Sequence, residues 1–208
     1  MDVKMYVTQY ASISVMFPTA LVVAAWLWSG ASRKAAFWWL CVVAAAYVVV
    51  ATSKVIFKGW GFGLESMDIA VISGHAMNAC LVFTVMLNLL LRQFDARWRW
   101  PALAVGLLAT WWFSVKYVGQ TIHPLPEAIA GALVGSAAAC VFLFKLENRP
   151  IGKIPQPALM VGLAVMLICS QAPKLSAEGM LNHVATSLSG AEQAFKRPHW
   201  REMPGGRA

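Results

Sequence analysis

Residues 114–127 form a short connection between two apolar runs, and this connection contains a lysine, a histidine and a glutamate. His123 precedes Pro124, which favours an extended backbone just outside a helix. Pro126 suits a first helical turn, so Glu127 is expected near the positive end of the helix dipole. An imidazole and a carboxylate four positions apart, at the mouth of an apolar helix, suit a nucleophile or base with its orienting partner. The sequence therefore predicts a catalytic centre here.

A second set of polar residues flanks neighbouring apolar runs and is expected at the same depth. Ser73 is a good N-cap for the run that opens at His75, and the amides after it point out of the helix. A helix N-terminus with lysines nearby is suited to an anion, phosphate above all. Of two histidines beside such a site, one can attack phosphorus and the other can donate a proton to the leaving oxygen. The predicted phosphate-binding residues are Lys54, Ser73, Gly74, Lys58 and Lys116, and the predicted catalytic residues are His123, His75 and Glu127.

The elements that must position these residues are apolar helices. Of the 208 residues, 59% are hydrophobic and only 12% are charged. The apolar residues fall in six blocks, each close to the ~20 residues that a bilayer-spanning helix needs. These observations predict an all-α, polytopic membrane protein with six transmembrane helices. The blocks cover roughly residues 10–30, 35–53, 75–91, 101–116, 127–144 and 157–173.

The four cysteines all lie inside apolar blocks and are expected to pack as small hydrophobic residues. No spacing among them supports a disulfide or a metal site. Residues 1–175 are predicted to form the membrane domain. In residues 176–208, apolar side chains recur at helical spacing from Met180 onwards, which predicts an amphipathic helix on the membrane surface followed by a polar tail, with disorder from Arg197. A tail that is disordered throughout is the alternative.

The net charge of +8 is expected to set topology and to meet anionic lipid headgroups, and a nucleic-acid partner is rejected. With six spans, loops one, three and five share one membrane face. The positive-inside rule assigns these loops to the cytoplasm, so that His75 and His123 face outward. The basic residues of these three loops are Arg33, Lys34, Arg92, Arg97, Arg99, Lys145, Arg149 and Lys153.

Two of these motifs resemble those of a known family. Ser73-Gly74-His75 at the start of one span, and His123-x-x-x-Glu127 at the start of another, look like the second and third motifs of the type 2 phosphatidic acid phosphatase family. The resemblance runs from about Lys54 to Gly135. It implies six membrane helices, a phosphohistidine intermediate, and hydrolysis of lipid phosphates or pyrophosphates without a metal or other cofactor.

The resemblance also assigns roles to individual residues. It implies that His123 is the nucleophile, that His75 is the general acid, and that Glu127 stands where the family usually has aspartate. Lys54 would be the phosphate-binding lysine of the first motif, with Ser73 and the Gly74 amide completing the phosphate cradle.

The chain departs from the family pattern at two arginine positions. Counting from Lys54, the place of the first motif's Arg-Pro is taken by Gly61-Phe62, and Val115 stands at the arginine position of the third motif. Two residues are also added before His123. Lys58 and Lys116 are the nearby substitutes, although a lysine cannot reproduce the bidentate fork of an arginine.

The leading hypothesis is a membrane hydrolase of lipid phosphates, such as a polyprenyl diphosphate, phosphatidic acid, phosphatidylglycerol phosphate or lipid A phosphate. It would act at the outer, periplasmic face of a bacterial inner membrane. A lipid phosphotransferase is a close variant. The alternative from another class is a non-catalytic lipid-binding or transport-assisting protein with the same fold. The missing arginines favour this alternative, whereas the presence of both histidines and the glutamate favours catalysis.

Overall fold

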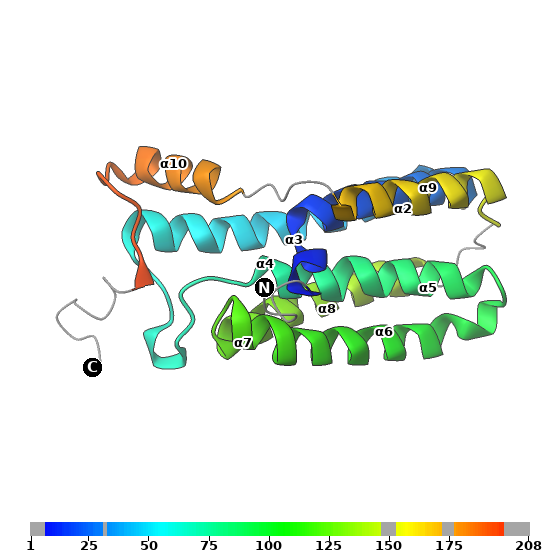
Figure 1. Ribbon diagram of the computed structural model, residues 1–208, viewed down its shortest axis with the longest axis horizontal. Coiled ribbons are helices and arrows are strands. Elements are labelled where there is room, and N and C mark those ends of the chain that lie inside the picture. Colours follow the sequence, from blue (N-terminus) through cyan, green and yellow to red (C-terminus); the bar gives the residue numbers. More distant parts are fainter. Residues whose placement is uncertain (1–6, 31–32, 147–152, 172–176, 198–208) are drawn as a thin grey trace.

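The computed structural model describes residues 7–30, 33–146, 153–171 and 177–197. Within these residues the regular structure is helical, with one isolated antiparallel bridge between Leu64 and Ile69. The long helices lie roughly side by side in an elongated bundle, as Figure 1 shows. They are α2 (Ile13–Gly30), α3 (Arg33–Trp60), α4–η3–α5 (Gly74–Asn78, Ala79–Phe83 and Thr84–Arg92), α6–η5–α7 (Arg99–Phe113, Ser114–Val118 and Gly119–Thr121), α8 (Leu125–Leu146) and α9 (Gln156–Gln171).

Four shorter elements complete the fold. They are the 3₁₀ turns η1 (Gln9–Ala11), η2 (Glu65–Met67) and η4 (Ala96–Trp98), together with helix α10 (Glu178–Ser189). The helix predicted after residue 176 therefore forms, and it packs along the carboxyl-terminal part of α3 (Figure 1). The predicted disordered tail lies outside the described residues except for Arg197, and so does Arg149 of loop five.

Five of the described helices are long and apolar enough to cross a membrane. They correspond to the first five predicted blocks. The sixth block forms α9, an apolar helix of 16 residues that is shorter than the other five. The structure thus gives an all-helical protein with five candidate spans, and a sixth span remains a prediction.

The bundle has a packed interior and an apolar exterior. Trp39 and Phe142 are completely buried, with their ring centroids 5.0 Å apart, and the Trp39 indole donates a hydrogen bond to the carbonyl of Ala20 at 2.8 Å. On the outer surface, large apolar side chains such as Phe37 and Leu108 are 69% and 72% exposed. An apolar surface of this kind is suited to lipid rather than water.

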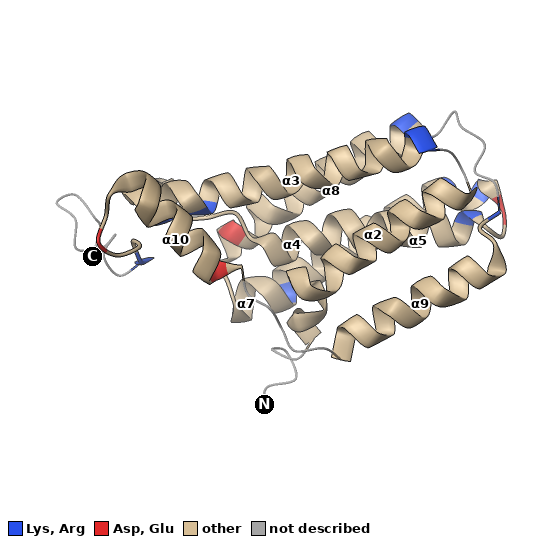
Figure 2. Cartoon of the chain, turned by 90° about the horizontal axis from the view of Figure 1, so that it is seen from above, with Lys and Arg blue, Asp and Glu red and all other residues tan. Residues whose placement is uncertain are grey.

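Charged residues gather at the two ends of the bundle. Figure 2 shows the middle stretches of the long helices without charge, and lysines and arginines clustered at the end where α2 meets α3 and α5 meets α6. The opposite end carries the carboxyl terminus of α3 and the amino termini of α4 and α8. This second end is where the sequence-predicted site residues lie.

Candidate functional site

His123 and Glu127 form a hydrogen-bonded pair at the start of α8. The Nδ1 atom of His123 lies 2.8 Å from Glu127 Oε2, and both side chains are largely buried. In a neutral ring the proton on Nδ1 is donated to the carboxylate, so Nε2 carries the free lone pair. The ring of His75, at the start of α4, lies beside this pair, with its centroid 6.2 Å from that of His123. Three of the predicted residues therefore meet in one place.

The loop before α4 is fastened to two other helices by consecutive backbone amides. The amides of Ala70 and Val71 each donate to Glu127 Oε1 at 3.0 Å, and the amide of Ile72 donates to the Ser53 hydroxyl at 3.1 Å. The Ser73 amide donates to the backbone carbonyl of Glu127 at 3.2 Å. These bonds join the loop to α3 and α8, and so they fix where His75 begins its helix.

Ser73 acts as the predicted N-cap of α4. Its hydroxyl accepts from the amide of Ala76 at 3.4 Å, and its side chain is fully buried. Gly74 follows at the first helical position, where it is partly exposed. Ser73 is thus occupied with capping, whereas Gly74 lies at the surface next to His75.

Two glycines on α8 allow this helix to approach α4 closely. A Cβ atom at Gly131 would lie 2.2 Å from the carbonyl oxygen of Ser73, and one at Gly135 would lie 2.4 Å from the carbonyl oxygen of Met77. No real Cβ atom tolerates such distances. The four-residue spacing of small residues is the usual means by which membrane helices bring their backbones together. This contact brings His75 near His123.

Lys54 and Lys58 lie one turn apart on α3 and point to the same carboxylate. Lys54 Nζ is bonded to Glu178 Oε1, and Lys58 Nζ lies 2.7 Å from Glu178 Oε2. Lys58 also bonds to Asn182 Oδ1 at 2.6 Å. Lys54 and Glu178 are both close enough to His75 to interact with it electrostatically. The two lysines therefore do hold an oxyanion, which here belongs to α10.

The contacts with Lys54 and Lys58 change the pKa of Glu178. Burial by itself would raise its pKa, but the hydrogen bonds from Lys54 and Lys58 outweigh that effect and lower the pKa of Glu178 to about 2. Glu178 is consequently ionised at neutral pH.

Arg197 reaches the same site from the chain beyond α10. Its guanidinium bonds to Glu127 Oε1 and lies 2.6 Å from Asp68 Oδ1. Asp68 is in the left-handed backbone region, with φ of 54°, at the turn that the Leu64–Ile69 bridge closes. Arg197, the first residue of the tail predicted to be disordered, is thus part of the site.

Sequence reasoning placed some of these groups and missed others. The predicted site residues lie at this end of the bundle, and they are His75, His123, Glu127, Lys54, Lys58, Ser73, Gly74 and Lys116. The side chain of Lys116 on η5 is exposed, however, and it makes no ion pair with another described residue. Glu178, Asn182 and Arg197 were not predicted. Glu178 and Asn182 contact lysines more than 100 residues earlier in the chain. No local sequence pattern predicts contacts between residues so far apart.

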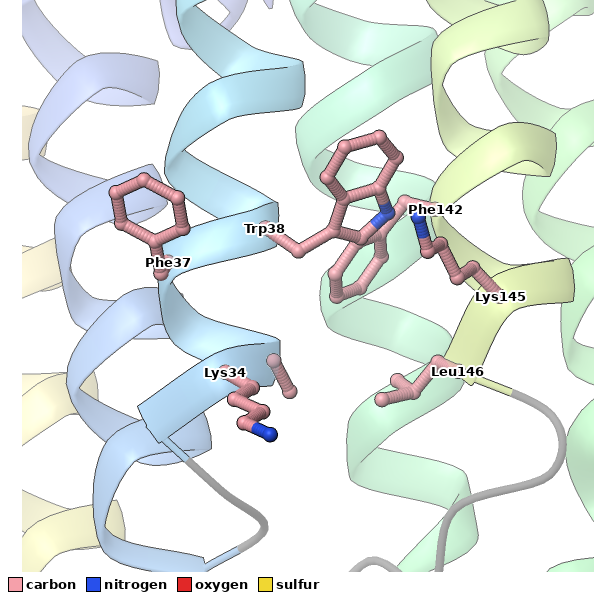
Figure 3. Close-up of a pocket in the computed structure, with 7 residues that line it drawn as sticks. Lys34, Phe37, Trp38, Phe142, Lys145 and Leu146 are labelled. Atoms are coloured by element: carbon pink, nitrogen blue, oxygen red, sulfur yellow. The ribbon is translucent and has the colours of Figure 1, made fainter.

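The described residues form no metal-binding cluster, and one cavity lies away from the histidines. No group of three His, Cys, Asp or Glu side chains among the described residues is arranged to hold a metal ion. A cavity of about 210 Å³ lies at the opposite end of the bundle, between the first turns of α3 and the last turns of α8 (Figure 3). There the ammonium of Lys145 lies 3.8 Å from the centre of the Trp38 ring. Most of the length of the bundle therefore separates this cavity from the two histidines.

The fold and the site define an all-helical protein whose apolar helices indicate a membrane protein, with two histidines, a glutamate and two lysines gathered at one end. The chain is similar to an uncharacterized 22.5 kDa protein in the cps region of Klebsiella pneumoniae, at 27% identity over 173 residues that cover 80% of this chain and 81% of that protein. No family model matches the chain, and no solved structure matches it.

Proposed function

We propose that this protein is a metal-independent phosphatase of membrane lipid phosphates that works through a phosphohistidine. The observation that carries the proposal is the His123–Glu127 hydrogen bond at 2.8 Å, with the ring of His75 only 6.2 Å from that of His123. A single phosphoryl group placed between the two rings can contact both. Binding alone needs no histidine aligned by a buried carboxylate, whereas nucleophilic attack benefits from one.

The reaction proceeds in two balanced steps. The Nε2 atom of His123 attacks phosphorus, the bond from phosphorus to the lipid oxygen breaks, and His75 donates a proton to that oxygen. Glu127 stabilises the positive charge that develops on the His123 ring. A water molecule then attacks the phosphohistidine, gives a proton to His75 and releases inorganic phosphate, which restores both histidines. The products are phosphate and a lipid alcohol, or phosphate and a lipid monophosphate where the substrate is a diphosphate.

The lysines on α3 supply the anion-binding part of the proposal. Lys54 and Lys58 already contact both oxygens of the Glu178 carboxylate. A phosphate group presents oxygens of the same charge and can replace that carboxylate once the Glu178 side chain turns away from the lysines. Lysine contacts made to a charged acceptor are among the stronger hydrogen bonds.

The substrate class follows from where the site lies. It is at one end of apolar helices, at the depth where lipid headgroups would be found if the helices span a bilayer. The topology predicted from basic residues assigns this end to the periplasmic side of a bacterial inner membrane.

The test is phosphate release by the purified full chain from a panel of lipid phosphates in mixed micelles. The panel contains phosphatidic acid, phosphatidylglycerol phosphate, a polyprenyl diphosphate and a lipid A phosphate. We expect release from at least one of them, and a loss of about 100-fold or more in His123→Ala and in His75→Ala. His183→Ala, which removes an exposed histidine of α10, is the matched control and should retain full activity.

A non-catalytic lipid-binding role is the second candidate, and it is favoured by the absence of arginine at the two motif positions, where the chain has Gly61-Phe62 and Val115. Vanadate binding does not distinguish the two roles, because either site would take up an oxyanion. Turnover does distinguish them. Phosphate release that persists undiminished in both histidine variants would contradict the phosphatase proposal, and so would its absence across the panel.

A further inference from the structure

Arg197 makes contacts with the candidate site that neither the motifs nor the proposed function assigns. One guanidinium nitrogen bonds to Glu127 Oε1, and the other lies 2.6 Å from Asp68 Oδ1. Arg197 is separated from Glu127 by 70 positions in the chain. A contact over this distance depends on how the carboxyl-terminal segment folds back over the bundle.

The path of that segment is fixed by contacts along α3. Helix α10 packs on α3 so closely that a Cβ at Gly59 would lie 3.1 Å from the Ala185 carbonyl oxygen. The helix ends at Gly190, whose φ of 72° reverses the chain. The amide of Phe195 then donates to the carbonyl of Lys58 at 2.8 Å. Arg197 follows two residues later, and it is therefore delivered to the loop beside Glu127.

Both oxygens of the Glu127 carboxylate are hydrogen-bonded. One oxygen bonds to His123, and the other accepts from the amides of Ala70 and Val71 and from Arg197. The side chain of Glu127 is only 3% exposed. A buried carboxylate is costly unless a cation or several donors compensate its charge. When His123 is neutral, Arg197 is the cation among the described residues that is ion-paired with Glu127.

We infer that Arg197 is a positioning residue of the proposed reaction, which keeps Glu127 ionised and aimed at His123. The inference rests on the proposed function. Arg197 does not replace the missing phosphate-clamping arginines, because both of its terminal nitrogens are engaged by carboxylate groups on Glu127 and Asp68. Its effect therefore falls on the chemical step rather than on phosphate binding.

The test compares Arg197→Ala with the wild-type full chain on whichever lipid phosphate the panel shows to be hydrolysed. We expect kcat to fall by about 10- to 100-fold, because a misplaced orienting group costs that much, while KM changes by less than about 3-fold. Guanidinium ion added to Arg197→Ala should restore part of kcat, and Arg197→Lys should retain more activity than Arg197→Ala. The matched control is Lys196→Ala, which removes the exposed neighbouring charge and should leave both constants unchanged.

A double-mutant cycle with Glu127→Gln shows whether Arg197 acts through Glu127. In the Glu127→Gln background, Arg197→Ala should cause little further loss of kcat. The same four proteins are compared by thermal unfolding, where the pair should again be non-additive. Additive losses, an unchanged kcat in Arg197→Ala, or a raised KM at constant kcat would each overturn the inference.

The outcomes also separate this inference from the proposed function. Phosphate release that depends on His123 but is undiminished in Arg197→Ala overturns only the role of Arg197. If the wild type releases no phosphate, the proposed function fails, and the unfolding cycle still decides whether Arg197 and Glu127 are coupled. Additive unfolding effects in that case overturn the inference as well.

Discussion

The carboxylate of Glu127 has to reach two targets at once, the imidazole of His123 and the amides of residues 70 and 71. A glutamate side chain in the first turn of α8 spans that gap. Aspartate is one methylene shorter, so it can serve one target but not both. The length of this side chain is therefore a property that a substitution can test.

We predict that Glu127→Asp lowers kcat by at least about 10-fold and that Glu127→Gln lowers it by about 100-fold or more. The first variant keeps the charge but loses the alignment, and the second keeps the length but loses the charge that stabilises the His123 imidazolium. Steady-state phosphate release gives both values. Glu65→Asp, in an exposed turn, is the control. A Glu127→Asp variant as active as the wild type would contradict the two-target explanation.

The predictable part of the site consists of residues whose roles are visible locally. His75 follows an N-cap serine, and His123 and Glu127 share one helix start, so their types and spacing indicate chemistry without coordinates. The contacts of Glu178 and Arg197 depend instead on α10 packing against α3, and a helix periodicity does not say which neighbour the helix packs against. For that reason the tail helix was predicted, but its place over the lysines was not.

At the scale of elements, the close packing of α8 on α4 carries the geometry of the site. Gly131 faces the Ser73 carbonyl at a distance that leaves no room for a methyl group. We predict that Gly131→Ala pushes the two helices apart, lowers stability by about 1–3 kcal/mol and lowers kcat, because His75 moves away from His123.

Thermal unfolding and phosphate release, measured on the same preparation, check this prediction. The matched control is Gly179→Ala on α10, where a Cβ would meet nothing within 4 Å, so that neither property should fall. If Gly131→Ala were as stable and as active as the wild type, the close approach would not be needed for the site.

Helix α10 occupies the two lysines that the proposed reaction requires. Glu178 must leave Lys54 and Lys58 before a phosphate can bind them, so the substrate competes with the protein's own carboxylate. We predict that Glu178→Gln lowers KM by about 3- to 10-fold with little change in kcat, because a neutral amide competes less well for two ammonium groups. Initial rates over a range of substrate concentrations give both constants.

The pH dependence of this effect has a definite sign. The pKa of Glu178 is lowered to about 2, so its ionised contact with the lysines stabilises the docked helix above the ordinary glutamate pKa and is lost as the pH falls from there towards about 2. The KM ratio between the variant and the wild type should therefore stay constant between about pH 5 and pH 8. A ratio that disappears within that range would show that another group controls the competition.

At the scale of the whole molecule, the hydrophobic blocks predicted the positions of the long helices, because a helix long and apolar enough to cross a bilayer leaves a long apolar run in the sequence. What they did not predict are the irregular turns inside helices, such as the π-helical segments η3 and η5. These depend on packing between helices, with Cys80 of η3 and Ser114 of η5 only 3.9 Å apart through Sγ and Oγ. Apolar composition carries no signal for such contacts.

The orientation of the bundle in a membrane is predicted from the distribution of its basic residues. The basic clusters at the α2–α3 and α5–α6 turns predict that this end faces the cytoplasm, which would place the histidines outside. A cysteine placed at each end reports the orientation. Glu65→Cys lies in the loop on the site end, and Phe94→Cys lies at the other end, where Phe94 is 84% exposed.

The reagent is a maleimide that does not cross the inner membrane, added to intact bacterial cells whose outer membrane lets it through. It should label Glu65→Cys in these cells. It should label Phe94→Cys only after the inner membrane is opened. The four native cysteines are buried or partly buried in helices, so the unsubstituted chain measures the background. The reverse pattern would place the site on the cytoplasmic side. A substrate would then have to reach the histidines from the inner leaflet, and the proposed chemistry would apply to lipid phosphates of that leaflet instead.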